Sequence, residues 1–137
     1  MTEPSLTVVV PSVNGLGDLM DCLAALTRQR TDVDLEVLVA DRCGESLRRE
    51  VRATYPWVRL LEAPPATTIP DLRALAFREA RGKSVAVIED HVIVPPGWAR
   101  ALLDAQAGAD VVVGGAIENA AVDRLVDQER QQHAHRH

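Results

Sequence analysis

Short aliphatic runs alternate along the chain with stretches in which apolar residues recur every three or four positions. The runs are bounded by Gly, Pro, Asn or Asp and predict buried β-strands, of which the most hydrophobic, at 85–88, is expected to be central. The predicted strands lie at residues 6–10, 35–40, 58–61, 85–88 and 111–113. The helical spacing predicts helices over residues 16–29, 47–55 and 70–80, and a short one through Trp98 and Leu102.

This alternation is typical of right-handed β-α-β units, which form a mainly parallel sheet with helices on both faces. The composition agrees, because 47% of the residues are hydrophobic and only 3% are aromatic, as in cores built from aliphatic side chains. We therefore predict an α/β fold with three layers, α/β/α, in one domain over residues 1–127. Residues 128–137 are rich in Gln, Arg and His, and we expect a solvated tail there.

The formal net charge of −5 argues against nucleic-acid binding, because no excess of positive charge is available for a phosphate backbone. A small anionic ligand remains compatible if a divalent cation bridges it to acidic side chains. No apolar run is long enough to form a transmembrane segment. The two cysteines, Cys22 and Cys43, have no metal-type spacing, so we expect free thiols and a cytoplasmic location.

Ligands of parallel α/β sheets bind beyond the carboxyl ends of the strands. That edge is expected to collect the polar segments 11–14, 41–42, 63–68 and 89–91. In the last of them, Glu89, Asp90 and His91 follow the most hydrophobic strand directly. Carboxylate and imidazole groups both suit Mn²⁺, and oxygen ligands suit Mg²⁺, so these residues predict a divalent metal site. The alternative is a strand-end turn whose acidic side chains only face water.

Two further polar residues are candidates for ligand contacts. Asp41 ends the second predicted strand and could accept hydrogen bonds from a ribose or a base, although a strand-end Asp often only caps a turn. Arg73 lies in the first turns of the third predicted helix and could pair with phosphate, although an exposed helical Arg is common. Gly15 and Gly17 do not complete a dinucleotide fingerprint, because Met20 stands where the third glycine is required.

Taken in order, these motifs resemble family-2 glycosyltransferases of the GT-A fold over roughly residues 6–127. Val-Val-Val-Pro-Ser-Val-Asn at 8–14 is similar to the opening strand and turn of that family, and Val-Leu-Val-Ala-Asp at 37–41 to its second strand. Residues 73–82, ending in Ala-Arg-Gly, resemble the segment before the metal-binding strand. Residues 85–91 resemble the strand that leads into the Asp-x-Asp motif, and Pro-Gly-Trp at 96–98 and Val-Gly-Gly-Ala-Ile at 113–117 follow in the expected order.

The resemblance implies a nucleotide-diphosphate sugar of the UDP or GDP type as the donor of a transferred sugar. Asp41 would recognise the nucleoside and Arg73 the diphosphate. Glu89, Asp90 and His91 would hold Mn²⁺ or Mg²⁺, with Glu89 and His91 standing where the family carries aspartates. The nucleotide-sugar site would comprise Pro11, Ser12, Asn14, Asp41, Arg73, Glu89 and Asp90.

The family normally continues into an acceptor-binding half that carries the catalytic base, but this chain leaves the pattern near Gln128. We find no position that matches the base, so the catalytic residue is unknown, and we expect a truncated, donor-binding part. A missing C-terminal half would leave apolar surface uncovered and favour self-association. The alternative is a non-catalytic, degenerate GT-A module that binds a nucleotide or a protein. A receiver-like fold is disfavoured, because the acids follow the second and fourth predicted strands rather than the first and third.

Overall fold

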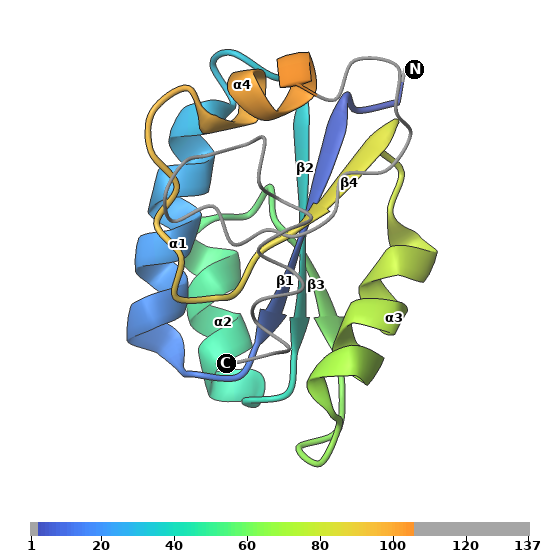
Figure 1. Ribbon diagram of the computed structural model, residues 1–137. Coiled ribbons are helices and arrows are strands. Elements are labelled where there is room, and N and C mark those ends of the chain that lie inside the picture. Colours follow the sequence, from blue (N-terminus) through green and yellow to red (C-terminus); the bar gives the residue numbers. More distant parts are fainter. Residues whose placement is uncertain (1–2, 106–137) are drawn as a thin grey trace, which may run out of the picture.

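The computed structural model describes residues 3–105, which form a parallel four-stranded sheet with helices on both faces (Figure 1). The strand order is β3-β2-β1-β4. The strands are β1 (Leu6–Ser12), β2 (Leu35–Asp41), β3 (Arg59–Glu62) and β4 (Ser84–Val87). The helices are α1 (Leu16–Gln29), α2 (Glu45–Thr54), α3 (Ile69–Glu79) and α4 (Trp98–Ala105).

Two apolar clusters fill the space on either side of the sheet. The larger one joins the sheet to α1, α2 and α4, and its fully buried members include Leu23, Val51 and Leu102. The smaller one lies between the sheet and α3, where Leu72 and Ala76 pack against Val9, Leu38 and Ala40. The predicted three-layer α/β/α fold is therefore confirmed, with the two faces covered unequally (Figure 1).

The predicted central position of β4 is not seen within residues 3–105 and stays a prediction. Among these strands β1 lies between β2 and β4, and β4 stands at the end of the order. Its residues Ala86 and the following Ile88 are buried on one face, while Val85 and Val87 are only partly buried on the other. The predicted strand at 111–113, the domain end at 127 and the tail at 128–137 lie outside the described residues.

The parallel register brings two distant segments together at one edge of the sheet. β1 pairs with β4 from Leu6 opposite Ser84 to Val9 opposite Val87, and the N–H of Ile88 donates to the carbonyl of Val9 at 3.0 Å. Both strands therefore end side by side, which places residues 11–14 next to residues 89–91. On the other side of β1, Ser12 lies opposite Asp41 of β2.

The segment that follows residues 89–91 is fixed by a buried glutamine at the end of α1. Gln29 donates from Nε2 to the carbonyl of Pro95 at 2.9 Å, and its Oε1 accepts from the N–H of Ala99 at 2.9 Å. The second of these bonds satisfies one of the N–H groups that a helix leaves unpaired in its first turn, here that of α4. α1 thereby holds both the turn before α4 and its first residues.

A polar cluster at the opposite edge of the sheet holds the C-terminal end of α3. Glu36 of β2 accepts hydrogen bonds from Thr7 Oγ1 at 2.8 Å, from the N–H of Arg81 at 3.0 Å and from Arg59 Nη1 at 3.0 Å. Partial burial opposes ionisation of Glu36, but the bonds from Arg81, Thr7 and Arg59 outweigh it, so the pKa of this carboxyl is lowered from 4.5. The ionised form therefore ties the loop after α3 to β1 and β2.

We expect this cluster to make folding stability depend on acid pH. Because the pKa of Glu36 is lower in the folded state, its contribution is complete above the unfolded pKa and is lost as the pH falls through the folded value. Glu36→Gln should cost about 1 kcal/mol near pH 7, the net size of a typical hydrogen bond, and should flatten the loss of stability in acid. Urea unfolding between pH 3 and pH 7 measures both effects.

The control for this prediction is Glu45→Gln, since Glu45 also has a lowered pKa, chiefly through its hydrogen bond from Arg52, but lies on the surface. Solvent screens such a surface pair, so its removal should change the acid dependence much less. An equal flattening in both variants would contradict the role given to Glu36.

Candidate nucleotide-sugar site

A cavity of about 230 Å³ opens where β1 and β4 end and α3 begins. Six of the predicted site residues line it, from the turn after β1, the first turns of α3 and the turn after β4. Val13 and Ile69 also line it and were not predicted. The lining residues are Pro11, Val13, Asn14, Ile69, Arg73, Glu89, Asp90 and His91.

Asp90 joins the two turns that form the floor of this cavity. Its side chain is buried, and Oδ2 accepts hydrogen bonds from the N–H groups of Val13 and Asn14, both at 2.8 Å. Oδ1 accepts a third from Asn14 Nδ2 at 2.7 Å. A carboxylate that accepts two adjacent backbone N–H groups and an amide fixes the loop between β1 and α1. The structure therefore gives Asp90 a positioning role.

Glu89 and His91 flank Asp90 in this short turn, and His91 Nδ1 lies 3.8 Å from Asp90 Oδ1. Their side chains are about half exposed, and His91 Nε2 lies 3.1 Å from Glu89 Oε1. Within residues 3–105 no group of three or more His, Cys, Asp or Glu side chains is placed to hold a metal ion. The predicted three-residue set is therefore not assembled here; what the turn presents to the cavity is a carboxylate and an imidazole in contact.

Arg73 brings a positive charge to the same cavity from the second turn of α3. Its Nε is buried and has no hydrogen-bond partner among the described residues. A buried donor without a partner is unfavourable unless a ligand or water satisfies it. Because Arg73 also lines the cavity, an anion in the cavity is the natural partner for this group.

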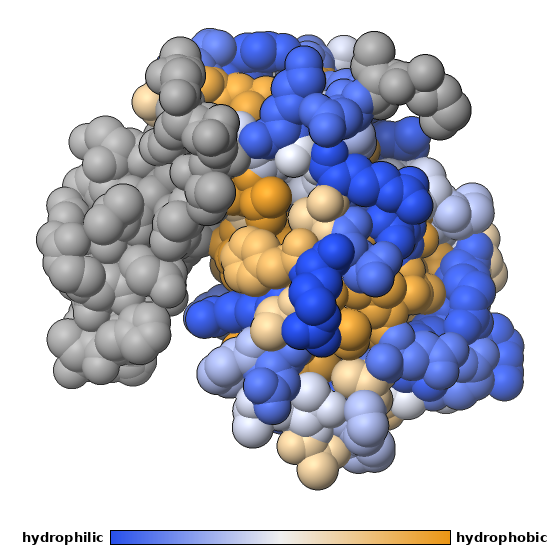
Figure 2. All heavy atoms as spheres, turned by 90° about the vertical axis from the view of Figure 1, so that its right-hand side faces the viewer, coloured by the Kyte–Doolittle hydropathy of each residue, from blue (hydrophilic) through white to orange (hydrophobic). Residues whose placement is uncertain are grey.

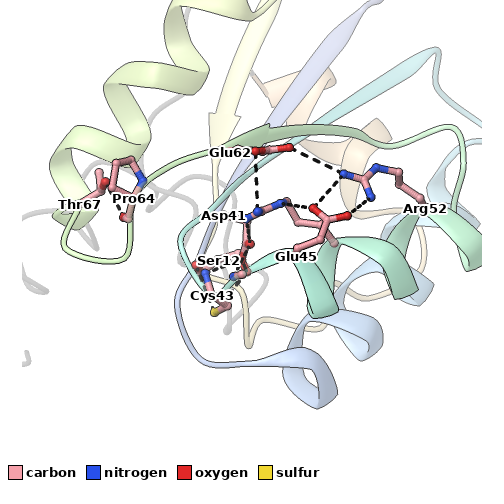
Figure 3. Close-up of polar contacts among 10 residues, drawn as sticks. Ser12, Asp41, Cys43, Glu45, Arg52, Glu62, Pro64 and Thr67 are labelled. Atoms are coloured by element: carbon pink, nitrogen blue, oxygen red, sulfur yellow. Dashed lines mark hydrogen bonds and ion pairs between the residues drawn. The ribbon is translucent and has the colours of Figure 1, made fainter.

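Asp41 and Ser12 lie outside the cavity lining and are engaged with one another (Figure 3). The Asp41 carboxylate is fully buried, with Oδ1 accepting from Ser12 Oγ at 2.8 Å and from the N–H of Cys43 at 3.0 Å. Oδ2 accepts from the N–H of Gly44 at 3.1 Å and pairs with Arg48 Nη1 at 2.8 Å. Four donors thus satisfy the carboxylate, and it holds the turn between β2 and α2.

The two thiols have different surroundings but are both protonated at neutral pH. Burial raises the pKa of Cys22 to about 12. Cys43 is exposed, yet partial desolvation and the neighbouring Asp41 charge also raise the pKa of its thiol. Both cysteines are free, as expected, and neither is activated as a nucleophile.

The sequence analysis did not single out Val13, Ile69 or Arg48, although the first two line the cavity and the third pairs with Asp41. Val13 and Ile69 are apolar, and only their places beside a strand end and a helix start indicated the site. Arg48 is almost fully buried on α2 and neutralises Asp41, but nothing in its local sequence marks it as buried. The one usable signal was that an Asp at the end of a buried strand needs a cationic or N–H partner.

A comparison with protein families decides the identity of the fold. The family model described as glycosyl transferase family 2 matches residues 7–135, almost the whole chain. The chain belongs to glycosyl transferase family 2. The match extends beyond residue 127, and the domain end that we placed there stays a prediction. A search of curated protein sequences found no match.

Solved structures that align with this family 2 chain include the following two proteins. A mannosyltransferase from Pyrobaculum calidifontis, in complex with GDP-Man and Mn²⁺, aligns with a TM-score of 0.63 and 23% identity over 82% of this chain and 34% of its own. S. aureus TarS, residues 1–349, aligns with a TM-score of 0.59 and 21% identity over 74% of this chain and 33% of its own. The chain thus spans about a third of the length of either structure.

The surface of this family 2 domain carries some exposed apolar side chains. Figure 2 shows apolar areas among hydrophilic ones on the face that carries α3, and Ile69 and Phe77 of that helix are exposed. The predicted self-association stays a prediction. None of the helices between residues 3 and 105 has the length and hydropathy needed to cross a membrane. The predicted cytoplasmic location is likewise untested.

Proposed function

We propose that this chain is the donor-binding part of a glycosyltransferase and binds a nucleotide-diphosphate sugar of the UDP or GDP type. The observation that carries the proposal is the buried Nε of Arg73, which has no hydrogen-bond partner among residues 3–105 and lies at a cavity whose rim also holds Glu89 and His91. The Arg73 guanidinium and the two metal-type ligands Glu89 and His91 line the same cavity. This combination suits a diphosphate that is bridged to the protein by a divalent metal ion. The complex of the Pyrobaculum mannosyltransferase with GDP-Man and Mn²⁺ supports the same chemistry.

The residues of the cavity have different roles under this proposal. Arg73 binds the diphosphate by charge-assisted hydrogen bonds. Pro11, Val13 and Asn14 form one wall of the cavity. Asp90 fixes this wall by accepting hydrogen bonds from the N–H groups of Val13 and Asn14. The cavity of about 230 Å³ is smaller than typical pockets for whole drug-sized ligands, so the described residues enclose only part of such a donor.

Glu89 and His91 fit a divalent cation as two protein ligands, since their oxygen and nitrogen atoms lie in contact and face solvent. Mn²⁺ accepts both ligand types, whereas Mg²⁺ prefers oxygen, so we propose Mn²⁺ before Mg²⁺. Asp90 is not part of this revised set, because its oxygens already accept three hydrogen bonds. When bound, the cation would offset the negative charge of a diphosphate leaving group.

Calorimetric titration of UDP and of GDP, each with and without MnCl₂, tests the proposal. We expect binding of one nucleotide that is stronger with Mn²⁺, and a loss of about tenfold or more in Arg73→Gln, as for a hydrogen bond to a charged group. His91→Ala and Glu89→Gln should remove the dependence on Mn²⁺. Arg78→Gln is the matched control, because Arg78 is an exposed residue of the same helix outside the cavity lining.

The same titration separates the proposal from the alternative of a non-catalytic module. The observation that favours this alternative is that Glu89 and His91 are joined by no third metal ligand among residues 3–105. If neither nucleotide binds in the presence or absence of Mn²⁺, donor binding is refuted and a module with another partner is favoured. Metal-dependent binding that Arg73→Gln leaves unchanged would refute the phosphate role of Arg73.

A further inference from the structure

Arg42 links the end of β2 to the start of α3 across the site. Its N–H donates to the carbonyl of Ser12 at 3.3 Å, which fixes its backbone at the edge of β1. Its guanidinium Nη1 donates to the carbonyl of Thr67 at 2.8 Å, and the side chain is half-buried. Arg42 does not itself line the cavity, so its effect on a ligand there must pass through the segments that it joins.

The segment that Arg42 holds leads directly into α3. Thr67 closes a turn on Pro64, with its N–H at 3.0 Å and its Oγ1 at 2.7 Å from the Pro64 carbonyl (Figure 3). The next residue, Thr68, is the N-cap of α3 and accepts from the N–H of Asp71 at 3.2 Å. The first two turns of the helix then carry Ile69 and Arg73, both of which line the cavity. A shift of this turn therefore shifts the cavity wall.

Packing alone holds α3 weakly, which makes its end contacts important. Only Leu72 and Ala76 of the helix are fully buried against the sheet. At its C-terminal end, Arg59 binds the carbonyl of Glu79 at 3.1 Å and its carboxylate at 3.0 Å. At its N-terminal end, the hydrogen bond from Arg42 to the carbonyl of Thr67 fixes the residue just before the N-cap. The two arginines thus anchor opposite ends of a helix that is about 16 Å long at roughly 1.5 Å per residue.

We infer that Arg42 is a positioning residue, which sets the affinity for a nucleoside diphosphate by fixing the helix that presents Arg73. This inference rests on the proposed donor site and adds a residue to it. The Arg73 side chain must be fixed in position to bind an anion. If the start of α3 were disordered, ordering it would reduce the free energy of binding. Arg42 reduces that cost without contacting the ligand.

The test is a double-mutant cycle in the full chain, with UDP and GDP as probes in the presence of MnCl₂. Arg42→Met should weaken the binding of the preferred nucleotide about tenfold, the size expected for one hydrogen bond to a charged group. In an Arg73→Gln background the same change should weaken it less than about twofold, because the residue through which Arg42 acts is gone. Arg42→Lys should recover part of the affinity, since the bond to Thr67 needs a single cationic donor.

Arg59→Met is the matched control, because it releases the far end of the same helix. It should lower the melting temperature while changing affinity less than about twofold, the limit expected for additive, distant sites. If Arg42→Met fails to fold at the assay temperature, Arg42→Gln takes its place; because its amide keeps a donor, its loss of affinity should be smaller but should again nearly vanish in the Arg73→Gln background.

Four results would overturn the inference. Losses from Arg42 and Arg73 that multiply in the double variant would mean that Arg42 acts independently of Arg73. An Arg59→Met variant that binds as weakly as Arg42→Met would mean general loosening of the helix. An Arg42→Met variant that binds like the wild type would refute the inference while leaving the donor site intact. Failure of the wild type to bind either nucleotide would refute both.

Discussion

Asp90→Ala is expected to destabilise the fold by about 3–4 kcal/mol and to abolish nucleotide binding in the cavity, because it removes three hydrogen bonds to one buried charge. The change leaves the N–H groups of Val13 and Asn14 without their acceptor and releases the Asn14 side chain. These groups belong to the loop that walls the cavity. Stability and binding should therefore fall together.

Urea unfolding gives the loss of stability, and calorimetry with UDP or GDP and Mn²⁺ gives the loss of binding. Asp90→Asn keeps the shape but replaces one acceptor oxygen with an N–H₂ group that faces donors, so it should fall between wild type and Asp90→Ala. His91→Ala is the complementary control: it should weaken metal-dependent binding with little effect on stability, since His91 is half exposed. A stable Asp90→Ala protein would show that the loop is held by other means.

Gly82→Ala is expected to cost about 1–3 kcal/mol of stability, the range for forcing an extra methyl group into a packed site. A Cβ at position 82 would lie 2.5 Å from the backbone N of Thr7 and 2.6 Å from its Oγ1. The backbone of β1 is in the middle of the sheet and has no room to move away. The shift would also strain the 2.8 Å bond from the Gly82 N–H to Thr7 Oγ1.

Thermal and urea unfolding measure this cost, with Gly17→Ala as the control. Gly17 lies on α1, and a methyl group added there would have no other atom within 4 Å, so alanine should be neutral or slightly stabilising. Because Gly82 lies at the opposite edge of the sheet from the cavity, Gly82→Ala should bind nucleotide normally at temperatures where it is folded. Equal stability of the two variants would contradict the close approach of Gly82 to β1.

The fold was predictable because each element carries its own local pattern. The aliphatic runs gave the strands to within two residues, and the leucine spacing from Leu16 gave α1 over the residues that the structure assigns to it. The hydrophobicity of β4 does not fix its place in the strand order. A strand covered by helices on both faces is apolar wherever it stands in the order, because hydrophobicity reports the coverage of faces and not the number of neighbouring strands.

The site was predicted as a set of segments but not as a set of roles. Residues 11–14 and 89–91 meet as expected, because parallel strands end at one edge. The division between Asp90, which turns inward, and its neighbours Glu89 and His91, which face the cavity rim, depends on the backbone path through the turn. Likewise, the sequence places Asp41 at a strand end but does not reveal that Arg48 and two backbone N–H groups already satisfy it.

The short pairing of β4 with β1 has a consequence for how the protein opens. Only four residue pairs join these strands, and the cavity lies across the seam between them, with walls from β1 on one side and from α3 and β4 on the other. Local separation of β4 therefore destroys the cavity while leaving β1, β2 and their helices in place. A ligand that binds only when β4 is paired lowers the population of the separated form by the factor 1 + [L]/Kd, so amide hydrogen exchange in β4 should slow as the cavity is occupied.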